Sequence, residues 1–213
     1  MKRIVRFAAW VAFLAVLVVT AALLVVQGRG VSARPDPSWI EIRAALFLRS
    51  WLTPPMYKGL RNPVTATDEN FAVARQHFAD HCASCHANDG SGNTEMGRGF
   101  YPKSPDMRLP RTQQLSDGEI FYFIENGIRL TGMPAWSTGT PEGEKASWEL
   151  VHFIRRLPAL TPEDLAIMER FNPVSREQFE EEQKIEEFLE GRDPEPPPPA
   201  DPHAGHQPPP PPK

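Results

Sequence analysis

The sequence predicts an all-α protein: one helical domain, a membrane-spanning helix before it and a disordered, proline-rich tail after it. Three observations support this. An unbroken apolar run opens the chain, apolar residues in its middle recur at steps of three and four, and 11 of the 24 prolines lie in the last 20 residues. Steps of three and four place apolar side chains on one face of a helix. A chain of 213 residues has room for one ordinary domain with appendages.

Residues 1–30 form the predicted membrane element. Three basic residues precede an apolar run from Phe7 to Val26, and Ile4 and Val5 extend it, so that residues 4–26 would contact the lipid bilayer. A helix needs about 20 apolar residues to cross a membrane, whereas the apolar part of a cleaved signal peptide has about 7–15. The length therefore favours an uncleaved anchor. Small residues at 31–33 leave a cleaved signal sequence as the alternative.

Residues 31–62 predict an amphipathic juxtamembrane linker. Apolar and aromatic residues between Trp39 and Leu52 are interleaved with Arg43 and Arg49, and two prolines then end the pattern. Aromatic residues beside arginines, close to a membrane span, are typical of a helix in the lipid interface. The alternative is a helix that packs across the globular domain as a collar. The sequence leaves both interpretations open.

Residues 63–161 carry three well-marked helices. Thr67 is the predicted N-cap of the first, with two carboxylates in the following turn. The sequence from Ser116 to Glu119 is typical of a capping box and starts the second. The third starts at Glu142 and ends before Pro158. This arrangement predicts a compact helical body.

The remaining segments contain fewer apolar residues. Residues 87–114 are rich in Gly, Asn, Pro and Ser, and predict an irregular stretch that wraps around something or is itself functional. Residues 162–190 predict a charged, partly helical extension. Residues 191–213 have too few apolar residues to offset the entropy of ordering and predict a disordered tail. Its His203 and His206 would bind a metal only weakly.

Charge divides the chain in the same way. The net charge is +7 over residues 1–62, −3 over residues 63–161 and −8 over residues 162–213. A nucleic-acid-binding protein would carry its positive charge on the folded body. We therefore expect no nucleic-acid partner.

The clearest chemical signal is Cys82-Ala83-Ser84-Cys85-His86, which contains both cysteines of the chain. Two thiols three residues apart, followed at once by histidine, are the attachment pattern of haem c. The thiols would form thioethers to one porphyrin, and His86 would lie beneath the ring as an iron ligand. A redox dithiol needs a βαβ context, and a structural zinc site needs four ligands. Neither accompanies this motif, so the sequence predicts one covalent haem.

The second iron ligand is predicted to be a methionine. Three methionines follow the attachment motif, namely Met96, Met107 and Met133. Met133 is favoured because Gly132 permits close approach to the ring and Pro134 fixes the chain just after the sulfur. Met107 is the next candidate, and core filling is the alternative role for Met96 or Met107. His77, His81 and His152 are expected on helix faces instead.

The order of these features over about residues 65–160 resembles class I cytochrome c of the bacterial, membrane-anchored, single-haem type. The resemblance implies that the helix with Phe78 crosses the helix with Trp148, with Ala74 as the small residue at the crossing. It also suggests haem-propionate partners, at positions with an ordinary surface or core role as the alternative: Tyr101, Arg108, Arg129 and Trp136.

The function implied is electron transfer without catalysis, between membrane-bound or periplasmic redox proteins of a respiratory chain. The chain would be a single-pass protein of the bacterial inner membrane, with its haem domain on the periplasmic side. It would act as a free carrier or as the haem subunit of a larger complex. The alternative is a ligand-binding haem protein, a gas sensor or a peroxidase, with an open or displaceable sixth iron position.

Overall fold

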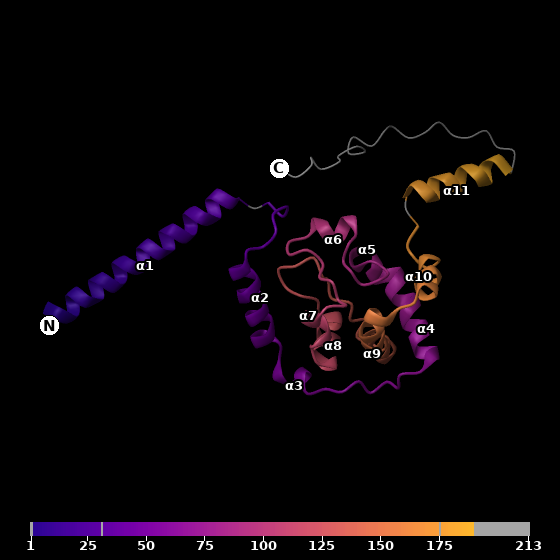
Figure 1. Ribbon diagram of the computed structural model, residues 1–213, viewed down its shortest axis with the longest axis horizontal. Coiled ribbons are helices and arrows are strands. Elements are labelled where there is room, and N and C mark those ends of the chain that lie inside the picture. The colour runs from indigo at the N-terminus through magenta and orange to yellow at the C-terminus, as the bar shows by residue number, and fades with distance from the viewer. Residues whose placement is uncertain (1, 31, 175, 190–213) are drawn as a thin grey trace. The chain divides into compact units, whose positions relative to one another are not determined.

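All regular structure is helical in the described part of the chain, as predicted (Figure 1). The computed structural model describes residues 2–30, 32–174 and 176–189. The chain divides into two compact units, Met1–Asn172 and Pro173–Lys213. The expected tail at residues 191–213 lies outside the described residues.

The first helix, α1 (Lys2–Arg29), is long and apolar enough to cross a membrane. The candidate span runs from Lys2 to Gly28, its most apolar 18-residue window has a mean hydropathy of 2.8, and none of that window is buried inside the protein. A helix that is apolar all round and uncovered by protein suits a hydrocarbon surrounding. This is consistent with the predicted single-pass anchor.

The next two helices contact the domain. In α2 (Trp39–Leu52) the Arg49 guanidinium lies 5.4 Å from the centre of the Phe123 ring. In α3 (Pro55–Lys58) the Tyr57 ring packs 4.7 Å from that of Tyr122. The backbone of α3 also approaches α8 closely at Gly118, where an added Cβ would lie 1.8 Å from the Tyr57 carbonyl oxygen. Only glycine permits this approach, so α3 and, through Arg49, one face of α2 lie against α8.

The three main helices begin and end close to the predicted positions. In α4 (Asp68–His77) the N-cap Thr67 accepts a hydrogen bond from the Asn70 amide at 3.1 Å. The capping box predicted for α8 (Asp117–Asn126) is present, and Gly127 ends the helix with a φ of 64°. Thr140 caps α9 (Pro141–Arg156), which starts one residue before the prediction.

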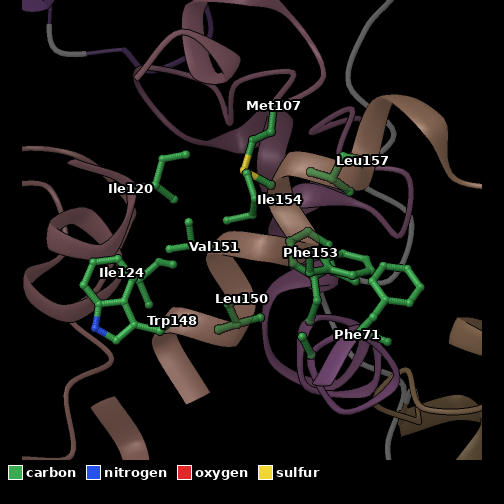
Figure 2. Packing of buried hydrophobic residues seen from close by; sticks show 14 of the residues in the cluster. Phe71, Met107, Ile120, Ile124, Trp148, Leu150, Val151, Phe153, Ile154 and Leu157 are labelled. Carbon is green, nitrogen blue, oxygen red and sulfur yellow. The ribbon is translucent and has the colours of Figure 1, made fainter. Parts of the chain in front are cut away.

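The core lies where α4 crosses α9, and one aromatic ring joins the two helices (Figure 2). The Phe153 centroid of α9 is 5.6 Å from Phe71 and 4.8 Å from Phe78. Ala74 is 1% exposed in the same cluster, in agreement with the small residue expected at the crossing. On another face of α9, Trp148 stacks on Phe121 of α8 at 4.0 Å and 6°. One helix therefore holds both of its neighbours through aromatic contacts.

Short helices follow where the sequence predicted irregular chain. α6 (Glu95–Gly99) and α7 (Pro110–Gln113) interrupt residues 87–114. Beyond α9, a 3₁₀ turn, η2 (Leu157–Ala159), leads to α10 (Pro162–Glu169). Met168 of α10 is fully buried in the core, so α10 is part of the first compact unit.

The second unit contributes one described helix, α11 (Arg176–Leu189), which has 14 residues. Its described apolar side chains are exposed, namely Phe179, Ile185, Phe188 and Leu189. Residues 176–189 of the predicted extension are thus helical, whereas residues 162–169 form α10 of the first unit.

We predict that Phe153→Ala lowers the free energy of unfolding by about 3–5 kcal/mol, because it removes a fully buried ring from the helix crossing. Val73→Ala is the matched control, since Val73 lies on α4 but is half exposed. The measurement is guanidinium-induced unfolding of the detergent-solubilised protein, followed by far-ultraviolet circular dichroism. Similar losses in both variants would contradict a core centred on Phe153.

Candidate functional site

The two cysteines are positioned by an irregularity in the backbone. At Phe78 the α-helical hydrogen bonding of α4 changes to a π-helical turn, η1 (Phe78–Cys82), which leads into α5 (Ala83–His86). Phe78 and Ala79 are 1% and 0% exposed, so the wide turn is anchored in the core. Cys82, Cys85 and His86 therefore come from one short, fixed piece of helix. π-Turns are frequent at functional sites, and no sequence signal had predicted this one.

The two cysteines carry free thiols and do not form a disulfide. Burial, with a smaller contribution from the nearby Cys85, raises the pKa of the Cys82 thiol to about 12. A catalytic or redox-active dithiol needs a lowered thiol pKa, so this environment argues against that use. Within the described residues, no group of three or more His, Cys, Asp or Glu side chains could hold a metal ion. The zinc alternative therefore finds no further ligands in that part of the chain.

His86 has the character of a neutral ligand. Burial lowers the pKa of its imidazole to about 4, so the ring is uncharged at neutral pH. Its Nδ1 is buried and has no hydrogen-bond partner among the described residues. Next to it, Ala87 adopts a φ of 59°, which is rare for a residue with a side chain. The His86 carbonyl accepts a hydrogen bond from the Gly92 amide at 2.8 Å, which fixes the start of the following loop.

That loop closes over the cysteines. The Thr94 hydroxyl donates to the Cys85 carbonyl at 3.3 Å. A Cβ at Gly97 would lie 2.3 Å from the same carbonyl oxygen. The Cys85 thiol donates to the thioether of Met96, with 3.3 Å between the sulfurs. The stretch after the motif therefore packs directly on it, in agreement with an irregular segment that wraps around the site.

Met133 lies in a tightly bonded loop after α8. Its amide donates to the Thr131 hydroxyl at 3.1 Å, and its carbonyl accepts from the Ile128 amide at 3.1 Å. Leu130 has a φ of 62°, a second rare backbone conformation in this region. A Cβ at Gly132 would lie 2.6 Å from the Phe100 ring. The absence of a side chain at Gly132 is therefore required by Phe100, a partner the sequence did not reveal.

Trp136 connects the Met133 loop to the cysteine-bearing segment. Its ring meets the His81 ring edge-on at 5.7 Å, and His81 belongs to η1. Its amide donates to the Ile124 carbonyl of α8 at 3.0 Å. The structure thus brings the loop that contains Met133 alongside the turn that carries Cys82.

The other two methionines occupy different surroundings. Met107 is 7% exposed and belongs to the hydrophobic core, where Figure 2 shows it near Ile154. Its amide also donates to the Gly90 carbonyl at 2.8 Å. Met96 is 53% exposed beside Cys85. Core filling therefore describes Met107 and not Met96.

The expected propionate partners do not form one group. The Tyr101 hydroxyl donates to a carboxylate oxygen of Glu41 in α2 at 3.0 Å. Arg108 donates to Asp89 at 2.8 Å and to Asp106 at 2.7 Å. The hydrogen bond from Arg108 holds the pKa of Asp106 below its ordinary value. Arg108 is thus already paired within the protein, while Arg129 is exposed.

The other histidines among the described residues, namely His77, His81 and His152, lie on helices, as expected. The rings of His77 and His81 meet edge-on at 4.9 Å. His152 of α9 has its Nε2 2.7 Å from the Val64 carbonyl, which ties the start of the domain to α9.

Residues 69–154 match the family described as Cytochrome C oxidase, cbb3-type, subunit III. The chain contains a c-type cytochrome domain. The match spans about two-fifths of the sequence and covers α8, nearly all of α4 and α9, and the Cys82–His86 motif. Together with the all-helical fold and the apolar α1, it agrees with a membrane-anchored class I cytochrome c. No curated protein matches the chain significantly.

A c-type cytochrome domain implies haem c, and the residues around the motif fit that group. The observation is the His86 imidazole, which is neutral, buried and unpaired at Nδ1. Burying such a polar group without a partner is costly unless a ligand uses the ring. Haem iron accepts neutral imidazole, and two thiols one turn apart, the second directly before His86, suit covalent attachment.

We predict that Gly97→Ala lowers the yield of haem-loaded cytochrome severalfold, since its Cβ would press on the Cys85 carbonyl and move the motif. Gly99→Ala is the matched control, because it lies in the same helix and its Cβ would meet nothing within 4 Å. The measurement is the ratio of haem to protein absorbance after purification from equal cell mass. Equal ratios in the two variants would contradict a loop that holds the motif through Gly97.

Proposed function

We propose that this protein is an electron carrier with one haem c, bound covalently through Cys82 and Cys85 and ligated at iron by His86 and Met133. It would pass single electrons between membrane-bound or periplasmic respiratory proteins. The observation that carries the proposal is the short turn on which two thiols and a neutral, buried imidazole stand together. The match of residues 69–154 to a cytochrome family supports the same conclusion.

Bound haem supplies a reversible one-electron change at iron. The chain's own part is to hold the group rigidly. The burial of Phe78 and Ala79 fixes the turn that carries the cysteines, and the Gly92 amide fixes the His86 carbonyl. Rigid ligands limit rearrangement when the charge changes, which suits electron transfer and not chemical conversion.

Met133 is supported as the second ligand by its surroundings. Its loop lies beside the cysteine-bearing turn through the Trp136–His81 contact, and hydrogen bonds fix its backbone on both sides. Met107 is committed to the core. A methionine ligand raises the potential and closes the iron to small molecules.

Three residues are proposed to contact the haem propionates, namely Trp136, Tyr101 and Arg129. Trp136 stands between the Met133 loop and η1 and is the best placed. Arg129 is an exposed cation in the Met133 loop, whereas Tyr101 would contact a propionate only by giving up the hydrogen bond from its hydroxyl to Glu41. Arg108, paired with Asp89 and Asp106, is assigned to holding the loop that follows the motif.

The proposed location is the periplasmic face of the bacterial inner membrane. The first turns of α1 carry Lys2, Arg3 and Arg6 ahead of its long apolar part, which favours a cytoplasmic start and an exported domain. The matched family is described as an oxidase subunit, which favours a haem subunit of a larger complex over a free carrier. Copurification of other subunits with the chain from native membranes would support this choice, and recovery of a monomer alone would contradict it.

We predict that the wild-type protein is low-spin in the ferric state and that its ferrous form does not react with carbon monoxide. Met133→Ala should open the site, giving a high-spin ferric spectrum and a ferrous form that binds carbon monoxide. Met96→Ala is the matched control and should behave as wild type. The measurement is visible and near-infrared absorption, which contains a sulfur-to-iron charge-transfer band only when methionine is bound. Binding of carbon monoxide by the wild-type protein would contradict the proposed electron carrier and favour a gas sensor or a peroxidase.

Each cysteine should form one thioether. We predict that Cys82→Ser and Cys85→Ser each retain haem through one bond, which shifts the pyridine haemochrome band to longer wavelength than in wild type. The double variant should lose all of its haem to acidified acetone. Retention of haem by the double variant would contradict covalent attachment through these residues.

A further inference from the structure

The helix α2 presents apolar side chains on two opposite faces. Its inner face contains the partly buried Ile42, Leu46 and Arg49, spaced four and three residues apart, and it leads to the buried Thr53. The outer face of α2, as we call it, carries side chains that are 61–70% exposed: Ile40, Phe47 and Trp51. Ile40, Phe47 and Trp51 are spaced seven and four residues apart, so they form one stripe of the helix.

The inner face is held against the domain by specific contacts. Arg49 lies over the Phe123 ring of α8, and Glu41 accepts a hydrogen bond from Tyr101. At the C-terminal end, Thr53 is 2% exposed and caps the helix itself, since its hydroxyl donates to the Arg49 carbonyl at 2.7 Å. The Arg49 and Glu41 contacts with the domain fix the rotation of α2, so the outer face points away from α8.

The chain keeps this outer face close to the membrane. α1 ends at Arg29 and α2 begins at Trp39, which leaves residues 30–38 between them. Such a connection spans at most about 35 Å when fully extended. Lys103 of the domain also pairs with Asp36 at 2.7 Å, which shortens the free part of the connection further. A covalent tether of this length keeps α2 near the bilayer surface, so that binding to the surface costs little additional entropy.

The chemistry of the outer face suits lipid. Tryptophan gathers at membrane interfaces because its ring is apolar and its N–H is polar, and interfacial helices place Trp and Phe on their apolar face. Arg43 lies among these residues in the sequence and would meet lipid phosphates, while the single carboxylate of α2, Glu41, is engaged by Ser38 and Tyr101. A face of aromatic residues with one arginine and no carboxylate resembles an interfacial helix.

We propose that the outer face of α2 lies in the lipid–water interface, while its inner face holds the cytochrome domain. α2 would then orient the domain on the membrane, which a flexible tether alone cannot do. This inference goes beyond the proposed electron transfer and does not depend on the identity of the iron ligands.

The test places a nitroxide spin label at Phe47→Cys in the full, haem-loaded chain. The protein is reconstituted in nanodiscs of phosphatidylethanolamine and phosphatidylglycerol. The control label is at Val73→Cys, which is similarly apolar and half exposed on α4. Power-saturation electron paramagnetic resonance measures the change caused by oxygen, which concentrates in lipid, and by a nickel chelate, which stays in water. Because each change is a difference, the contribution of haem iron cancels.

We expect the ratio of oxygen to nickel accessibility to be severalfold higher at position 47 than at position 73. A second label, at Ile40→Cys, should lose this preference when Phe47→Asp and Trp51→Asp are added, and should keep it when Val73→Asp is added. A label at position 47 that is open to nickel would place the outer face in water. A label shielded from both reagents would place it against a protein partner. Either result overturns the proposal, whatever the spectrum of Met133→Ala.

Discussion

The packing of Phe153 between Phe71 and Phe78 is the interaction on which the rest of the site depends. Phe78 is both a core residue of this crossing and the first residue of the π-turn that leads to Cys82. The same burial that stabilises α4 against α9 therefore fixes where the wide turn begins. On the solvent side, the Arg156 guanidinium covers the Phe71 ring at 3.9 Å from its centre. Stability and site geometry are thus joined in one aromatic cluster.

The sequence predicted the main helices because each carries strong local signals. The N-cap Thr67 and the capping box from Ser116 to Glu119 each join residues that are three positions apart. The structure contains both. The attachment motif is equally local, since Cys82, Cys85 and His86 lie within five consecutive residues, at the end of η1 and in α5. The family match and the described helices agree with the class of fold that these signals indicated.

Other features could not be predicted, because they depend on partners distant in sequence. The π-turn has no residue signature, and it exists because the core accepts both Phe78 and Ala79. The local sequence does not show why position 118 of α8 is glycine, because the reason is the close approach of the Tyr57 carbonyl from α3. Arg108 suggested a haem contact from its position alone, whereas two carboxylates of the folded chain compete for it. Local chemistry thus pointed to the candidate ligands, while long-range packing decided which residues support them.

The collar and interface interpretations of α2 were alternatives because the sequence pattern was interpreted as a single apolar face, which could contact either the domain or the lipid. In the structure, one face of α2 packs on α8 through Arg49 and Phe123, and a second apolar face lies on the opposite side. A helix needs only one such face to pack on a domain, and exposing the other to water would be unfavourable. If the outer face lies in the lipid interface as proposed, the two interpretations describe two faces of one helix. The proposed electron carrier would benefit from this arrangement, because a fixed orientation would direct the same surface of the domain towards partners in the same membrane.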